Sequence, residues 1–263
     1  MFSPKATFLI VCLAWCGSAL ALEDSPEQPL DTSIVADNLE DTYARCLIAA
    51  RQAPEIGMEM ALRWKRLTGG EPAKHCQAVA LLELGDVEEA AQRLEELADH
   101  PTALAPVRAG LYAQAAQAWM DSANYDRALV NINKSSQLRP DDAGLFFDRA
   151  LIHAALQDLW AAVDDLNRVL DIEPLAIDAL ILRGSAYRQL EIADLALDDI
   201  ERALAMEPNN IDALLEWSLL ARDRGDKTEA RLAWIRILEI APDSSTADVV
   251  RRHMEEMDVN SDS

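Results

Sequence analysis

The sequence predicts an all-α fold, and three observations carry that prediction. Strong helix formers dominate, with 44 Ala and 37 Leu among the 263 residues. Residues that interrupt helices are scarce, since the chain has only 9 Gly and 11 Pro, and this argues against an all-β or a disordered chain. Four of the prolines, Pro140, Pro174, Pro208 and Pro242, are separated by 34 residues each. This spacing indicates a repeated helical unit, and a hydrophobic content of 50% is enough to bury a core.

Other residue types keep the same 34-residue spacing. Two series hold small residues, Ala116, Ala150, Gly184 and Ser218 in one, and Ala128, Ala162, Ala196 and Ala230 in the other. A further series holds large apolar residues, namely Ile132, Leu166, Ile200 and Trp234. The series interlock in constant register over 109–244, so this segment is predicted to contain four copies of one unit.

Each unit has the pattern of two amphipathic helices. In 177–210, Leu180, Gly184 and Tyr187 follow the helical period, and Ile200 and Leu204 do so further along. Small residues let two helices approach closely, and a proline after the second helix ends it. The units resemble the tetratricopeptide repeat (TPR), which has the same length, small residues at two points and a closing proline. The resemblance implies an all-α solenoid of antiparallel helix pairs that stack to bury their apolar faces.

The pattern continues in weaker form outside the four clear repeats. The segment 37–108 is predicted to form divergent TPR-like helix pairs, the second of them in 71–104. The segment 245–263 is predicted to hold one capping helix, to about 257, and a frayed tail. Its N-cap is expected at Ser245 or Thr246, and its buried stripe at Val250, Met254 and Met257. The expected total is five to six helix pairs.

The N-terminus has the features of a secretory signal peptide. Lys5 precedes a nearly continuous apolar run, and Ala19 and Ala21 supply the small residues before a cleavage site after 21. The sequence therefore predicts a signal peptide over 1–21, a flexible acidic lead over 22–36, and an exported, periplasmic protein without a membrane span after cleavage. Two alternatives are an uncleaved N-terminus that tethers the chain to the membrane, and a lipoprotein modified at Cys16.

Export leaves Cys46 and Cys76 as the cysteines of the mature chain. An even pair in an oxidising compartment predicts a disulfide, which would join the first helix of the N-terminal unit to that of the next. The alternative is a metal site made by the two cysteines and His75. It is disfavoured because the adjacent residues His75 and Cys76 point in different directions on a helix and no fourth ligand is evident, so we expect no metal and no cofactor.

Charge and motifs exclude several classes of function. A net charge of -22 repels phosphate, which argues against binding to nucleic acids and anionic membranes. The sequence lacks the common nucleophile, nucleotide-binding and zinc-protease motifs, and His153 lies at a packing position, so the chain is expected not to be an enzyme. The alternative is an enzyme whose site is assembled from scattered residues without a recognisable motif. The acidic pairs Asp164-Asp165 and Asp198-Asp199 do not match a calcium loop and are interpreted as solvated helix faces.

The resemblance to TPR proteins implies a non-enzymatic scaffold that binds a partner protein or peptide along a concave groove. First-helix positions line that groove in the family, and here they are Gln117, Met120, Phe147, Leu151, Ile181, Ser185, Arg188, Leu215, Leu219 and Arg222. The predicted groove is largely apolar, and this favours a hydrophobic or amphipathic segment as its ligand. Two alternatives stay open: the apolar residues serve only as packing between repeats, or the same surface forms a homo-oligomer.

Overall fold

A computed structural model describes residues 39–67, 69–100 and 103–259 of the chain. Within these residues every regular element is an α-helix. In chain order the helices are α1 (Leu39–Gln52), α2 (Pro54–Leu67), α3 (Gly70–Leu84), α4 (Val87–Ala98), α5 (Ala105–Asp121), α6 (Tyr125–Leu138), α7 (Ala143–Ala155), α8 (Leu159–Ile172), α9 (Ile177–Gln189), α10 (Ala193–Met206), α11 (Ile211–Asp223), α12 (Lys227–Ile240) and α13 (Ser245–Val259). The predicted signal peptide and acidic lead lie outside the described residues, as does the end of the tail. No described helix is both long and apolar enough to cross a membrane.

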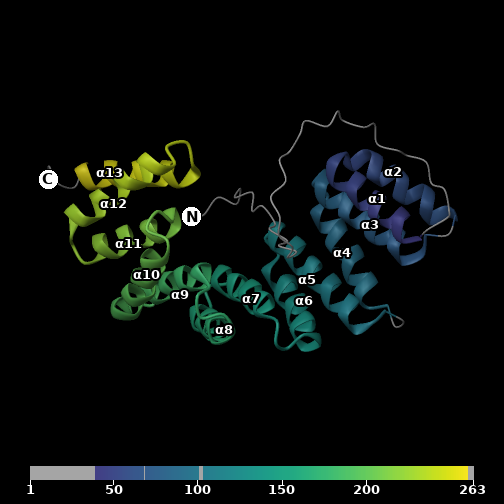
Figure 1. Cartoon of the computed structure of the whole chain (residues 1–263), viewed down its shortest axis with the longest axis horizontal. Helices are drawn as coiled ribbons and strands as arrows, with labels where there is room; N and C mark the ends of the chain where they lie inside the picture. Colours follow the sequence, from purple (N-terminus) through teal and green to yellow (C-terminus); the bar gives the residue numbers. More distant parts are fainter. Residues whose placement is uncertain (1–38, 68, 101–102, 260–263) are drawn as a thin grey trace.

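The helices form six consecutive pairs and one additional helix, arranged along an arc (Figure 1). Each odd-numbered helix from α5 to α11 packs on the even-numbered helix that follows it. In addition α5 contacts α7, and α9 contacts α11, whereas neighbouring second helices in the described chain make no comparably extensive contact. Elements on the inside of a curve are closer together, so α5, α7, α9 and α11 form the inner face of the arc. The predicted all-α solenoid of five to six pairs is confirmed.

Small residues allow the close helix contacts that the repeat requires. Gly184 of α9 is an example, because a Cβ atom there would lie 2.9 Å from Cδ1 of Ile200 on α10. Around this contact, Ala150, Ala162, Ala196 and Leu166 are fully buried in one core cluster that continues from α7 to α11. The 34-residue series therefore correspond to the contact surfaces within and between helix pairs.

Two buried ion pairs repeat with the same spacing. Arg149 on α7 donates two hydrogen bonds to Asp165 on α8, at 2.7 and 2.6 Å, and Arg183 on α9 does the same to Asp199 on α10, at 2.7 Å each. The remaining nitrogen of the guanidinium, Nη1 of Arg183, donates to Oδ1 of Asn167 in the preceding repeat at 2.7 Å. Asp165 and Asp199 are 4% and 1% exposed, so their interpretation as solvated residues was wrong. They fix the first helix against the second within a repeat.

The last helix closes the C-terminal end of the stack. Val250 and Met257 of α13 are buried against Trp234 and Ile237 of α12, and Met254 is partly buried there. The predicted capping helix is thus confirmed, although its N-cap is different from the expected one. The N-cap is Ser244, whose hydroxyl accepts from the backbone N–H of Ala247 at 3.1 Å. The helix therefore begins at Ser245, one residue after this cap.

Candidate binding face

The candidate site is the inner face of α7, α9 and α11. Leu151 on α7 and Leu219 on α11 are partly buried and lie outside the core clusters, so part of each side chain reaches the surface. Phe147 and Leu215 are also partly buried, but they pack against the cores beside them. Ile181 on α9 is only 9% exposed and belongs to the core. The apolar part of this face is therefore shallow.

The predicted groove begins on α5 with two less apolar positions. Gln117 is partly buried, and its Nε2 donates to Asp121 one turn later at 3.1 Å. Met120 is partly buried and packs against the core between α5 and α7. Burial raises the pKa of Asp121, against the effect of the hydrogen bond from Gln117.

The two arginines of the predicted groove already have carboxylate partners. Arg188 Nε on α9 donates to Glu216 Oε2 on α11 at 2.8 Å, and Arg188 Nη1 lies 3.6 Å from Asp223. Ser185 Oγ donates to the other oxygen of Glu216 at 2.8 Å. These contacts join the first helices of two neighbouring repeats. Arg222 on α11 lies 3.2 Å from Asp223 and reaches His253 of α13 at 3.4 Å. Neither guanidinium is available without loss of these bonds.

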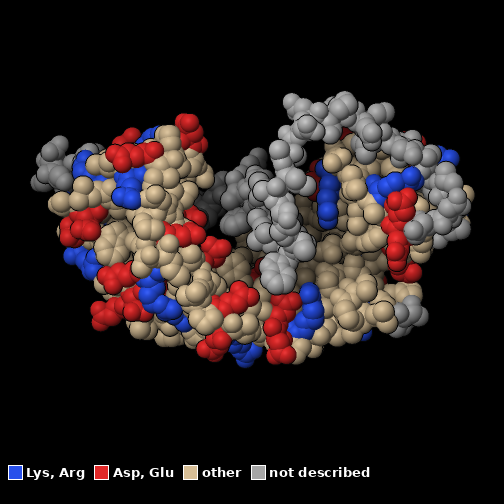
Figure 2. All heavy atoms as spheres, in the orientation of Figure 1, with Lys and Arg blue, Asp and Glu red and all other residues tan. Residues whose placement is uncertain are grey.

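Three carboxylates beside the apolar residues have no such partner. Within the described chain no Lys, Arg or His forms an ion pair with Asp148 on α7, Asp178 on α9 or Asp212 on α11. Burial raises the pKa of Asp148 to about 6, and the negative charge of Asp142 adds to that shift. Burial also raises the pKa of Asp212, with further contributions from the charges of Asp178 and Glu216. Figure 2 shows acidic and basic side chains interspersed over the arm of the arc that contains α9 to α13.

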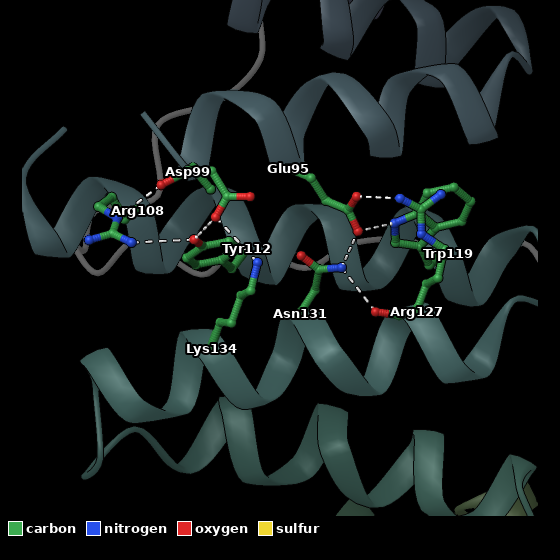
Figure 3. A network of polar contacts seen from close by, with 9 residues as sticks. Glu95, Asp99, Arg108, Tyr112, Trp119, Arg127, Asn131 and Lys134 are labelled. Atoms are coloured by element: carbon green, nitrogen blue, oxygen red, sulfur yellow. Dashed lines mark hydrogen bonds and ion pairs between the residues drawn. The ribbon is translucent and has the colours of Figure 1, made fainter. Parts of the chain in front are cut away.

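A second polar cluster lies between α4, α5 and α6 (Figure 3). Glu95 on α4 accepts from Trp119 Nε1 at 2.8 Å and from Arg127 Nη2 at 2.6 Å, and it also accepts from Asn131. The Arg127 guanidinium carbon lies 3.9 Å from the centre of the Trp119 ring. The carboxylate of Glu95 and the guanidinium of Arg127 thus both have partners within the cluster. The cluster therefore fastens α4 to α5 and α6 of the next pair.

The same pairs are joined further along by Asp99, which follows α4. Its carboxylate accepts from the hydroxyl of Tyr112 and from Lys134 Nζ, the latter at 3.2 Å (Figure 3). The hydroxyl of Tyr112, followed by the charge and hydrogen bond of Lys134, lowers the pKa of Asp99. Arg108 Nε donates to the carbonyl of Ala98 at 2.9 Å. These contacts, like those of Glu95, hold α4 against the next helix pair.

The cysteines of the N-terminal pairs lie in a disulfide. Cys46 on α1 and Cys76 on α3 have Cα atoms 6.1 Å apart and are buried in the cluster that α1, α2 and α3 share. The alternative metal site consequently lacks its thiolate ligands. His75 accepts from the Tyr43 hydroxyl at Nδ1, at 2.5 Å, and its Nε2 lies 2.9 Å from Gln114 Oε1. Burial lowers the pKa of His75, which favours the neutral ring that this arrangement needs.

The chain is similar in structure to solved proteins built from helix pairs. A MamA structure from Desulfovibrio magneticus RS-1 matches with a TM-score of 0.59 at 19% identity, over 66% of this chain and 97% of MamA. A second MamA crystal structure matches with a TM-score of 0.54, also at 19% identity, over 63% of this chain and 94% of that one. YrrB, described as a TPR protein with an unusual peptide-binding site, matches with a TM-score of 0.54 at 15% identity, over 73% of this chain and 96% of YrrB. The chain has the TPR fold. No protein-family model and no curated protein sequence matches it.

Four carboxylates of the TPR inner face were missed by the sequence analysis. Asp178 and Asp212 are one repeat length apart, and Asp148 and Glu216 are two repeat lengths apart, so the signal was present in the alignment of the repeats. The apolar residues and the arginines of the first helices form the more conspicuous pattern, and the negative net charge of the whole chain conceals this local arrangement of carboxylates.

Proposed function

We propose that the protein is a non-enzymatic interaction scaffold that binds a segment of a partner protein on the inner face of α7, α9 and α11. The observation that carries the proposal is that Leu151 and Leu219, at the same repeat position on α7 and α11, are only partly buried and lie outside the core clusters, with Phe147 one turn before Leu151. The description of YrrB as a TPR protein with a peptide-binding site supports the same kind of role. Among the described residues no group of His, Cys, Asp and Glu is placed to hold a metal ion.

Binding on this face requires little rearrangement of the scaffold. The first helices are fixed by the buried pairs Arg149–Asp165 and Arg183–Asp199, and α9 is fixed to α11 by Arg188 and Glu216. A preformed surface lowers the entropic cost of binding, because only the partner segment has to become ordered. The shallow apolar strip suits an amphipathic segment that inserts a few side chains.

We further propose that the protein is exported and acts in the periplasm. The features of the signal peptide over 1–21 support this, and so does the disulfide between Cys46 and Cys76, since disulfides persist in oxidising compartments. The test is cell fractionation followed by N-terminal sequencing of the isolated protein. A periplasmic chain that begins at Leu22 is expected. A cytoplasmic chain, or a membrane-bound one that keeps residue 1, would contradict the proposal.

The binding proposal is tested by site-specific photo-crosslinking in cells. A photoreactive residue at Leu151 or Leu219 of the inner face is expected to capture one partner, whereas the same residue at Leu195 or Leu232 of the second helices is not. Leu195 and Leu232 are suitable controls because they are 48% and 61% exposed on α10 and α12. The captured protein is then purified and its affinity is measured directly. Capture only from the outer positions would overturn the proposal, and capture of a second copy of the chain would replace it by self-association.

A matched pair of variants tests the contribution of the apolar strip. Leu151→Gln with Leu219→Gln is expected to weaken binding of the purified partner about tenfold or more, because two apolar contacts are replaced by polar ones. Leu195→Gln with Leu232→Gln carries the same chemical change on the outer helices and is expected to leave the affinity unchanged. Thermal melts followed by circular dichroism check that both variants fold.

A further inference from the structure

The charged side chains on the inner face form two rows. The side chains of one row are paired with opposite charges, and those of the other are not. One row contains Arg188 and Arg222, and both are neutralised by carboxylates of the same chain, at 2.8 and 3.2 Å. The other row contains Asp148, Asp178 and Asp212, on three successive first helices, and the described chain offers these carboxylates no cation. Leu151 shares α7 with Asp148, and Leu219 shares α11 with Arg222 and Asp212. The face therefore presents an apolar strip with one unpaired charged side, and that side is negative.

We propose that the partner segment is amphipathic and cationic, with its apolar side on Leu151 and Leu219 and its Lys or Arg side chains on Asp148, Asp178 and Asp212. The inference rests on the proposed function and adds the chemistry of the partner to it. Charge complementarity selects this occupant, because a cation is the group that the unpaired row lacks.

An anionic segment fits the same face poorly. It would have to displace Glu216 from Arg188, a carboxylate that holds two hydrogen bonds of 2.8 Å from α9. It would also approach a chain with a net charge of -22. A cationic segment breaks none of these bonds and is attracted at long range by the same net charge.

The environment of the acidic row supports a ligand with positive charge. Burial of Asp148 disfavours its ionised form, and the nearby charge of Asp142 disfavours it further. At Asp212 the charges of Asp178 and Glu216 add to the effect of burial. A cation placed beside Asp148 and Asp212 would stabilise their ionised form, which burial and the neighbouring negative charges disfavour in the unbound protein.

The test uses synthetic peptides of about 18 residues, a length of about five helical turns. One has Leu and Lys in an amphipathic helical pattern, a second has Glu in place of Lys, and a third has the Leu and Lys composition in scrambled order. Each is titrated with the full chain, and fluorescence anisotropy gives the affinity. The amphipathic Lys peptide is expected to bind at least about tenfold more tightly than either other peptide. Its affinity is expected to fall about tenfold between about 50 and 300 mM salt.

Two variants with the same change of net charge separate the acidic row from general attraction. Asp148→Asn with Asp212→Asn removes two carboxylates of the inner face and is expected to weaken the Lys peptide at least about fivefold. Asp164→Asn with Asp198→Asn removes two exposed carboxylates of α8 and α10, also one repeat length apart, and is expected to change the affinity less than about twofold. Equal losses in both variants, or equal affinity for the Glu peptide, would overturn the inference.

The leucine variants distinguish failure of this inference from failure of the proposed function. If Leu151→Gln with Leu219→Gln weakens the purified natural partner while the two aspartate variants behave alike, the face binds a segment but the cationic partner is wrong. If the leucine variants change neither ligand, the inner face is not the binding surface, and both proposals fail. Circular dichroism melts of every variant confirm that a loss of binding is not a loss of folding.

Discussion

At the scale of single residues, the turn inside each repeat adopts a left-handed conformation that the sequence conceals. Ala123, Gln157, Glu191 and Gly225 occupy the same repeat position and have φ values of 57, 61, 62 and 82°. Only one of the four is a glycine, although this region of backbone conformation favours glycine. The turn is thus imposed by the packing of the two helices that it joins, and not by the residue in it.

Replacement of Glu191 by glycine is expected to stabilise the protein. The change relieves a left-handed side chain, and the expected gain in the free energy of unfolding is about 0.5 to 1 kcal/mol, measured by urea denaturation. Glu201→Gly, at an exposed position within α10, is the matched control and is expected to destabilise by about 1 kcal/mol. A loss of stability at both sites would show that Glu191 is not strained.

Asp148 is expected to make stability depend on pH. Its pKa is raised from 3.8 to about 6 by burial, so the folded state holds the proton more tightly than the unfolded state. The stabilising contribution of its proton is complete below the unfolded pKa and is lost as the pH rises through about 6. Asp148→Asn should therefore raise the free energy of unfolding at pH 7, by at most about 3 kcal/mol, and by about a third of that near pH 4.5.

Urea denaturation of the Asp148→Asn variant and the unmodified chain at both pH values measures this difference. Asp164→Asn provides the control, because that carboxylate is exposed on α8. If Asp148→Asn gave the same small effect as Asp164→Asn at pH 7, burial would not perturb the Asp148 carboxyl. The same variant appears in the peptide experiment, where its expected stability ensures that weaker binding is not caused by unfolding.

At the scale of helices, the sequence predicted the repeated helix pairs. It did not predict the contacts that join α4 to α5 and α6, where the 34-residue spacing is lost. The 34-residue series determined the pairs from α5 to α12, because the same contacts recur in each unit. The sequence did not predict that α5 begins at Ala105, before the unit boundary at 109. At this place in the chain α4 is joined to α5 and α6 by the bonds of Glu95 and Asp99. Such contacts join residues 13 to 36 positions apart in irregular combinations, which a periodic pattern does not contain.

The ion pair between α9 and α10 is expected to be costly to break and much less costly to replace. Arg183→Met removes the two short hydrogen bonds to Asp199, whose side chain is 2% exposed, and leaves it only the longer contact of 3.4 Å with the half-exposed Arg202, so it should destabilise by about 3 kcal/mol. Arg183→Met combined with Asp199→Leu should recover most of that loss, because no unpaired charge stays buried. Urea denaturation of the single and double variants measures the coupling.

A surface pair serves as the control for this experiment. Arg251 and Asp248 lie 2.8 Å apart on α13 with side chains 47% and 71% exposed. Arg251→Met is expected to change stability by less than about 1 kcal/mol. A comparable loss at both sites would mean that burial does not determine the contribution of Arg183.

The disulfide between α1 and α3 is expected to hold the N-terminal end of the stack together. Its cysteines are 30 residues apart, and replacement of both by Ala should cost about 3 to 4 kcal/mol by the chain-entropy argument. The core cluster of α1, α2 and α3 is separate from those further along, so the loss should be local. Hydrogen exchange is expected to quicken in α1 to α3 and to be unchanged in α9 to α12. Uniform quickening over the whole chain would contradict a local role.

At the scale of the whole molecule, a stack of helix pairs has two ends that must be covered. Each internal pair buries its apolar residues against the next pair, and the last pair has no such neighbour. Here α13 covers it, since Val250 is fully buried and Met257 is 8% exposed against the core of α11 and α12. The inner face and the end of the stack are therefore different kinds of apolar surface. The first is open in the described chain, and the second is closed by the chain itself.

Removal of α13 is expected to make the chain associate through its exposed end. Truncation after Ser244 uncovers Trp234 and Ile237, both 0% exposed in the intact stack, and an apolar end of this kind binds other copies of itself. The mass from sedimentation equilibrium should then rise more steeply with concentration than that of the intact chain. Truncation after Val259, which keeps α13, should behave like the intact chain. If the truncation after Ser244 also left the dependence unchanged, the end of the stack would not need its cap, and any self-association would have to use the inner face instead.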